Sequence, residues 1–199
     1  MITKLIAPML AVFLAGCIVQ SFYPFYTDRS TVALPQLNGE WDAVTAFGEK
    51  MDTAHVPPWR ISGDQIVAYE SDSSQPSQIH SIFFKAGGQL FCDSTAGDMG
   101  KGNLYWAWHT RPVHTVTKVE TNTDMITFKP LNLDWLTNQV AAGKVSLPRL
   151  ARPEDGNWPL FTVKPADWEK FLTKYANNAY AFPTNHIYVL RRHINMPVK

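Results

Sequence analysis

The stretch "IHSIFFKAGGQLFCDS", residues 79–94, decides the fold of this chain. Two runs rich in Ile, Phe and Leu flank the pair Gly87–Gly88. β-Branched and aromatic residues favour strands, and a Gly-Gly pair between two such runs is typical of a two-residue hairpin turn. Strands joined by so short a turn are antiparallel. The stretch therefore predicts a β-hairpin.

The same pattern recurs on both sides of this hairpin. "WRISGDQIVAYES" (59–71) turns at Gly63–Asp64, and "PVHTVTKVETNTDMITFKPL" (112–131) turns near residues 122–124. "LNGEWDAV" (37–44) predicts a strand before them, and "HIYVLRRHI" (186–194) predicts one after them. So many sequential strands curl and close. The chain is therefore predicted to be an antiparallel meander that closes into a small β-barrel.

The last third of the chain changes from the strand period to the helix period. "PADWEKFLTKYANN" (165–178) places Trp168, Phe171, Leu172 and Tyr175 on one helical face. "NLDWLTNQVAAGK" (132–144) has a weaker apolar face between a capping Asn and a terminating Gly. We expect a mainly β fold with two C-terminal helices (α+β), which lie on the barrel or across one mouth.

Gly39-Glu40-Trp41 resembles the Gly-x-Trp motif that opens the first strand of lipocalins. In that family the tryptophan closes the narrow barrel end, and an arginine from the final strand packs on it. The resemblance implies this structural role for Trp41 together with Arg191 or Arg192. Two features depart from the family pattern, namely the two helices and the absence of a clear second lipocalin motif. Another small barrel or a curled sheet therefore remains an alternative to the lipocalin-like barrel.

The N-terminus has the features of a secretory signal. Lys4 is the only charge in the first sixteen residues, and Leu5 to Ala15 forms an uncharged run of eleven residues. As a helix this run would be roughly 16 Å long, whereas the hydrocarbon core of a membrane is about 30 Å thick. The run is too short to span a membrane, and small residues follow it, as they do before a cleavage site.

Leu14-Ala15-Gly16-Cys17 resembles the lipobox of bacterial lipoproteins. The resemblance implies that Cys17 carries a diacylglyceryl group, that residues 1–16 are removed and that the new amine is acylated. Ile18, rather than Asp, follows the cysteine, which by the same resemblance favours the outer membrane, facing the periplasm. The alternatives are an ordinary signal peptide with a chance cysteine and an uncleaved anchor.

These features divide the chain into a signal peptide (1–16), a lipidated tether (17–37) and a single barrel-like domain (38–199). The tether contains Phe22, Tyr23, Phe25 and Tyr26, which are too apolar for a solvated linker. They pack on the domain or lie at the membrane interface, where aromatic side chains are favoured. Packing on the domain is the interpretation that we prefer.

Charge and cysteine content limit the function further. Residues 17–199 hold 17 basic and 17 acidic side chains, because Lys4 accounts for one of the 18 Lys and Arg residues. This balance gives no electrostatic footprint for nucleic acid and no polybasic patch for anionic lipid. Once Cys17 is committed to lipid, Cys92 has no disulfide partner, and we expect it to be a small buried apolar residue.

No motif for catalysis or for metal binding stands out. His80, His109 and His114 occur near predicted strands, but no HExxH motif, cysteine pair, Gly-x-Ser-x-Gly elbow or obvious acid pair accompanies them. "GDMGKG" (97–102) lacks the first glycine and the Ser or Thr of a P-loop. We therefore expect no catalytic residues, no metal and no cofactor.

"NLYWAWHTRP" (103–112) is the most suggestive sequence for ligand binding. Trp106 and Trp108 share one face of an extended segment. Such aromatic residues fill a barrel core or rim, which is the simpler interpretation, or they line an apolar ligand pocket.

The sequence as a whole favours a non-enzymatic lipoprotein of the bacterial cell envelope. Its partners would be the membrane, through the N-terminal lipid, and a small hydrophobic ligand or another envelope protein that it supports. "LNGEW" and "FFKAGGQLFCD" also resemble pieces of bacterial exported proteins, and this resemblance implies no function. The alternative is a periplasmic enzyme whose site is assembled from distant residues.

Overall fold

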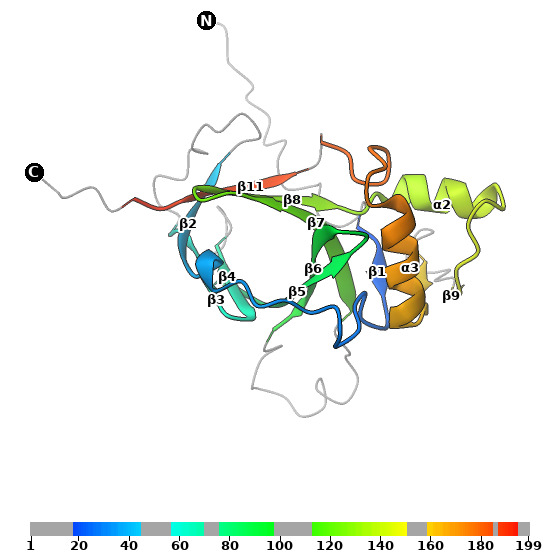
Figure 1. Cartoon of the computed structure of the whole chain (residues 1–199), viewed down its shortest axis with the longest axis horizontal. Coiled ribbons are helices and arrows are strands. Elements are labelled where there is room, and N and C mark those ends of the chain that lie inside the picture. Colours follow the sequence, from blue (N-terminus) through cyan, green and yellow to red (C-terminus); the bar gives the residue numbers. More distant parts are fainter. Residues whose placement is uncertain are drawn as a thin grey trace, which may run out of the picture.

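Eight of the described strands close into an antiparallel barrel (Figure 1). The structure is a computed structural model, which describes residues 18–44, 57–69, 76–97, 113–150, 159–184 and 187–194. Neighbours in the chain pair from β2 to β8, and β11 completes the ring by pairing with both β8 and β2. The barrel strands are β2 (Gly39–Val44), β3 (Trp59–Ser62), β4 (Gln65–Ala68), β5 (Ser77–Ala86), β6 (Gln89–Ala96), β7 (His114–Thr121), β8 (Met125–Pro130) and β11 (Tyr188–Arg192). The predicted fold class, a small lipocalin-like β-barrel with two helices, is confirmed.

The connections between strands give the barrel two different ends. Turns of two or three residues join β3 to β4, β5 to β6 and β7 to β8, as predicted. Gly87 and Gly88 adopt φ values of +56° and +75°, which a two-residue hairpin turn requires and which glycine adopts without strain. Alternate connections of a meander lie at the same end, so the long connections all lie at the opposite end. We call these the short-turn end and the long-loop end.

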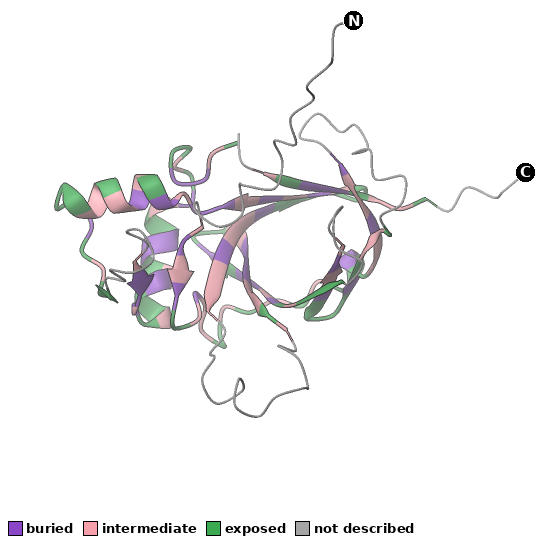
Figure 2. Ribbon diagram, turned by 180° about the vertical axis from the view of Figure 1, so that it is seen from behind, coloured by how far each residue is buried: buried purple, intermediate pink, exposed green. Residues whose placement is uncertain are grey.

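Buried residues recur along the strands of the barrel wall (Figure 2), and they belong to two separate clusters. Phe83 and Phe84 are adjacent on β5, and both are buried, but they belong to different clusters. Successive strand residues point to opposite faces, so one faces into the barrel and the other faces outward. The inner core consists of Leu37, Trp41, Ile61, Ile66, Phe83, Cys92, Val119, Ile126, Phe128 and Leu190.

An outer core lies between the barrel wall and two helices, α2 (Leu133–Ala141) and α3 (Pro165–Tyr175), which lie on one side of the barrel (Figure 1). The predicted apolar faces are the buried ones, since Trp168, Phe171 and Leu172 of α3 pack against the wall. Lys118 of β7 donates a hydrogen bond of 2.9 Å to the carbonyl of Ala176, at the C-terminus of α3. Among the described residues, no helix is long and apolar enough to cross a membrane.

Residues 18–37 pack on the barrel as part of the fold. Val19 and Phe25 are fully buried in the outer core, and β1 (Gln20–Ser21) pairs with the first two residues of β7. On its other edge β1 pairs with β10 (Leu160–Phe161), which in turn pairs with β9 (Arg149–Leu150). The packed structure therefore includes the segment that the sequence assigned to a tether, and Ile18 already forms a β-bridge with Asn132.

Trp41 and Arg192 are in contact towards the short-turn end. Trp41 is fully buried, and its Nε1 donates to the carbonyl of Leu37 in the 3₁₀ helix η1 (Pro35–Leu37), 2.9 Å away. The guanidinium carbon of Arg192 lies 4.1 Å from the centroid of the Trp41 ring, a cation–π contact.

Arg192 also connects three segments of the chain. It donates hydrogen bonds to the carbonyls of Gln36, Asn38 and Thr123, at 2.8, 3.4 and 3.2 Å. Arg191, the other arginine expected from the sequence, does not make the contact with Trp41. It is opposite Asp42 in the strand register, whereas Arg192 is opposite Trp41. Adjacent strand residues point to opposite faces, and this places Arg192 on the Trp41 side.

We predict that Arg192→Ala lowers the free energy of unfolding by about 2–3 kcal/mol, because it removes a cation–π contact and charge-assisted hydrogen bonds. Arg60→Ala is the matched control, because it removes only an exposed ion pair with Glu40, with an expected loss of about 1 kcal/mol or less. Urea unfolding of both variants, followed by tryptophan fluorescence, measures the difference. Equal losses in the two variants would contradict the role given to Arg192.

Candidate functional site

The long-loop end is where the sequence places its candidate ligand-binding residues. Trp106 and Trp108 belong to the connection between β6 and β7, which starts and ends at the long-loop end. Both tryptophans lie outside the described residues, as does Cys17. The site must therefore be built from the strands that this connection joins.

The inner face of the barrel changes character from one end to the other. Towards the short-turn end it is the apolar inner core around Trp41, whose members are almost completely buried. Towards the long-loop end four hydroxyl side chains from β5, β6 and β7 follow one another across the sheet. We call them the hydroxyl cluster: Ser81, Ser94, Thr115 and Thr117.

Strand register brings the hydroxyl cluster together. Ser81 is opposite Ser94, and Ser94 is opposite Thr115. The two serine Oγ atoms lie 3.5 Å apart, and Thr115 Oγ1 donates to the carbonyl of Ser94 over 3.2 Å. Thr115 and Thr117 follow the same alternation as Val119, a member of the inner core, so they face inward. Three of the four residues are partly exposed; only Ser81 is fully buried.

Thr117 stands out because its hydroxyl has no partner. Its Oγ1 is buried and makes no hydrogen bond. Among the described residues, every other buried side-chain oxygen or nitrogen has a hydrogen-bond partner. A buried hydroxyl left unpaired costs about 1–3 kcal/mol. Since the residue as a whole is partly exposed on the inner face, a polar group entering the barrel could accept or donate this hydrogen bond.

Cys92 lies where the hydroxyl cluster meets the inner core. It is opposite both Phe83 and Thr117, and its Sγ lies 3.6 Å from Ser94 Oγ. Burial raises the pKa of the thiol to about 12, although hydrogen bonds from Ser94 and Ser81 act in the opposite direction. Cys92 is buried and free, and the expectation of a small buried residue is confirmed.

A second polar arrangement, on the outer face, joins Asp93 to His114. The Asp93 carboxylate is almost completely buried; its Oδ1 lies 2.7 Å from Nδ1 of His114, and its Oδ2 accepts from the amide of Phe25 over 2.8 Å. Ser21 is opposite His114 in the register, but it is fully buried, donating to the carbonyl of Tyr23 and accepting from Trp168 Nε1. The serine is therefore not available to a substrate, and the arrangement fastens residues 21–25 to the wall.

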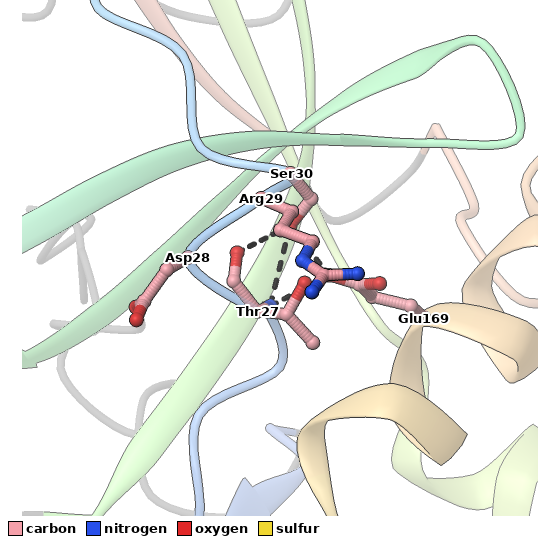
Figure 3. Close-up of a pocket in the computed structure, with 5 residues that line it drawn as sticks. All are labelled: Thr27, Asp28, Arg29, Ser30 and Glu169. Atoms are coloured by element: carbon pink, nitrogen blue, oxygen red, sulfur yellow. Dashed lines mark hydrogen bonds between the residues drawn. The ribbon is translucent and has the colours of Figure 1, made fainter.

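A surface pocket lies where the N-terminal segment meets α3 (Figure 3). Glu169 Oε1 accepts hydrogen bonds from the Thr27 amide and the Ser30 hydroxyl, while Asp28 points away from the other four residues. Partial burial acts to raise the pKa of Glu169, but these hydrogen bonds outweigh it and hold the pKa below its usual value. The carboxylate is thus occupied in holding the segment, and the pocket is lined by Thr27, Asp28, Arg29, Ser30 and Glu169.

The histidines do not converge. His80 pairs with Asp64 near the β3–β4 turn, at 2.9 Å, whereas His114 lies on the outer face with Asp93, and His109 is outside the described residues. In the part of the chain that the structure describes, no three His, Cys, Asp or Glu side chains are placed to hold a metal ion.

A further shallow pocket lies outside the barrel, over β2–β4 and the end of β11. It contains the exposed ion pair of Glu40 with Arg60 and the side chains of Tyr69 and His193. The exposed ion pair contributes little to stability, while His193 Nδ1 lies 2.9 Å from the partly buried carboxylate of Asp42 on β2.

The comparisons with family models, curated proteins and solved structures found no match for this chain. The function must therefore be argued from the geometry. The sequence analysis missed the hydroxyl cluster, the pairing of Asp93 with His114 and the contacts of Glu169. The serines and threonines of the hydroxyl cluster alternate along predicted strands, which is the pattern of a solvent-facing side of a strand as well as of a polar barrel interior.

We predict that Cys92 resists thiol reagents in the folded protein. With a pKa of about 12, only about one thiol in 10⁴ is ionised at pH 8, and the thiolate is the reactive form. The test is labelling with iodoacetamide in a Cys17→Ser variant, with and without urea, followed by mass spectrometry. Labelling of Cys92 in urea alone is the expected result, whereas rapid labelling of the native protein would contradict the burial.

Proposed function

We propose that this chain is a lipid-anchored, non-enzymatic protein of the bacterial cell envelope whose barrel binds a small ligand through its inner face. The ligand is largely apolar and carries a polar group. The anchor is Cys17, and the location is the outer membrane, facing the periplasm. This location rests on the lipobox resemblance and on Ile18.

The observation that carries the ligand proposal is the change in the inner face. A ligand would enter at the long-loop end, where three residues of the hydroxyl cluster are partly exposed and the Thr117 hydroxyl is unpaired. Its apolar body would lie next to the inner core, whose own side chains are almost completely buried. Ligand pockets typically combine an apolar lining with a few placed polar groups, and barrels hold ligands in their interiors. The tryptophans at positions 106 and 108 belong to the connection at the same end and are proposed to line the ligand pocket.

An enzyme is the second candidate, and the Asp93–His114 pair is the observation that favours it. A carboxylate that orients a histidine is a common part of acid–base sites. The pair lies on the outer face, however, and the second oxygen of Asp93 holds the amide of Phe25. We therefore assign these residues to the attachment of the N-terminal segment and prefer the binding protein.

We predict that Thr117→Val stabilises the ligand-free protein by about 1 kcal/mol, since it removes an unpaired buried hydroxyl. The same variant should bind a fluorescent fatty acid roughly fivefold more weakly, because one hydrogen bond of about 1 kcal/mol is lost. Thr115→Val is the matched control. The hydroxyl of Thr115 is already bonded to Ser94, so its loss should lower stability slightly and change the affinity less than twofold.

Fluorescence titration and urea unfolding measure these effects, and Trp106→Ala with Trp108→Ala extends the test to the β6–β7 connection. We expect the double variant to fold and to lose most of the binding. If the Thr117→Val variant and the tryptophan variant both bind the probe like the parent protein, the inner face is not the site.

We predict that Cys17→Ser releases the protein from the membrane fraction, because the acyl chains that hold it can no longer be attached. Mass spectrometry of the parent protein should find an acylated Cys17 at the N-terminus after loss of residues 1–16. The variant keeps the barrel intact, so circular dichroism should be unchanged. An unprocessed N-terminus with unaltered membrane attachment would contradict the anchor.

A further inference from the structure

The described chain begins in packed structure immediately after the proposed lipid anchor. Ile18 forms a β-bridge with Asn132, Val19 is fully buried, and Gln20 and Ser21 form β1. Only the peptide bond between residues 17 and 18 separates Cys17 from this structure. A flexible linker would let the barrel take any orientation, whereas an anchor joined to a packed strand restricts it.

The anchor emerges near the long-loop end. Ile18, the neighbour of Cys17, bridges Asn132, which lies two residues beyond Pro130, the last residue of β8. From there β1 runs towards Ser21, which is opposite His114, the first residue of β7. Both of these strand ends are at the long-loop end. The opposite end is about one strand away, because β8, which ends two residues before Asn132, has six residues and spans about 20 Å at 3.3 Å per residue.

Large apolar side chains are exposed on the same side of the molecule. Phe22 follows β1 and donates its amide to Phe161 of β10, and its ring meets that of Tyr23 edge to face at 5.0 Å. Leu150 is 57% exposed on β9, the outermost strand of the β1–β10–β9 extension.

Two tyrosines extend this side of the molecule. Tyr180 is 76% exposed and precedes Ala181, whose carbonyl accepts from the amide of Asn132. Tyr188 is 38% exposed, and as the first residue of β11 it lies at the long-loop end. It alternates with Leu190 of the inner core and is opposite Phe128, so it lies in the mouth of the barrel. We call these five residues the apolar collar: Phe22, Tyr23, Leu150, Tyr180 and Tyr188.

Exposed large apolar side chains are distributed unevenly between the two ends of the barrel. Among the described residues, six large apolar side chains are classed as exposed, and only Ile194 lies outside the collar, beyond the short-turn end of β11. Four of the five collar residues are aromatic, and three of these are tyrosines, which favour the boundary between water and lipid because the ring is apolar and the hydroxyl is polar. Exposed apolar groups that gather on one side mark an interaction surface.

We propose that the apolar collar lies against the headgroup region of the membrane that holds Cys17, with the long-loop end of the barrel facing the bilayer. This inference rests on the proposed anchor and adds an orientation to it. The short-turn end, towards which Trp41 contacts Arg192, then points away from the membrane. The hydroxyl cluster opens on the side of the lipid, and any ligand of the barrel is exchanged close to the membrane surface.

The test uses the lipidated chain in vesicles of phosphatidylethanolamine and phosphatidylglycerol, some of which carry a nitroxide on the headgroup. A fluorophore is attached at single cysteines in a Cys92→Ala background, at Tyr23→Cys or Tyr180→Cys in the collar. The matched controls are Asp64→Cys and Lys85→Cys, which are exposed near the short-turn end. We expect the nitroxide to quench the collar labels at least threefold more than the control labels.

A second set of variants separates the collar from the anchor. Phe22→Ser with Tyr23→Ser should reduce the quenching of a label at position 180, while the protein still floats with the vesicles. Equal quenching at both ends of a floating protein would overturn the orientation and leave the anchor intact. Failure of the parent protein to float would instead overturn the anchor.

Comparing pure lipid vesicles with native envelopes also tests whether the apolar collar binds a protein partner instead of lipid. Pure lipid vesicles contain no such partner, so collar labels that stay unquenched there but become protected from aqueous quenchers in native envelopes would overturn the lipid assignment.

Discussion

The contact between Trp41 and Arg192 is the interaction on which the barrel depends most directly. These two residues belong to the first and last strands of the ring, and their strands pair with each other. The guanidinium covers the indole at 4.1 Å and reaches the carbonyls of Gln36 and Thr123. One side chain thus joins η1, β2, the β7–β8 turn and β11. A meander has no edge left to associate with other chains only when its ends meet, and this contact lies at that junction.

The barrel wall carries different side chains on its inner and outer faces. Phe83 and Cys92 face the interior, while Phe84 and Phe91 face the helices. Because the wall is covered on both faces, the central strands are held from both sides. The hydroxyl cluster can then include an unpaired hydroxyl at Thr117 at a cost that the rest of the fold tolerates.

The sequence predicts the parts of this fold that depend on local chemistry. Gly87–Gly88 requires a turn, and Trp168, Phe171 and Leu172 form a helical face, so both were predictable. The choice of Arg192 over Arg191 was not, because Val189 and Leu190 are both buried and give the strand no clear alternation. Only the register with β2 decides which arginine faces Trp41. The packing of Val19 and Phe25 was equally hard to predict in detail, since their segment has no period and binds through single contacts such as that of Phe25 with Asp93.

Because these contacts hold the N-terminal segment, a lipid anchor at Cys17 would restrict the orientation of the barrel. Asp93 holds the amide of Phe25, Glu169 holds Thr27 and Ser30, and the outer core holds Val19. Asp93 lies on β6 and Glu169 lies on α3, and β1 pairs with β7, so the residues after position 17 are attached to three elements. An anchor attached in this way fixes the barrel's orientation as well as its location. For a site that exchanges an apolar ligand, orientation matters more than tethering, because apolar molecules are concentrated in the bilayer and scarce in the surrounding water.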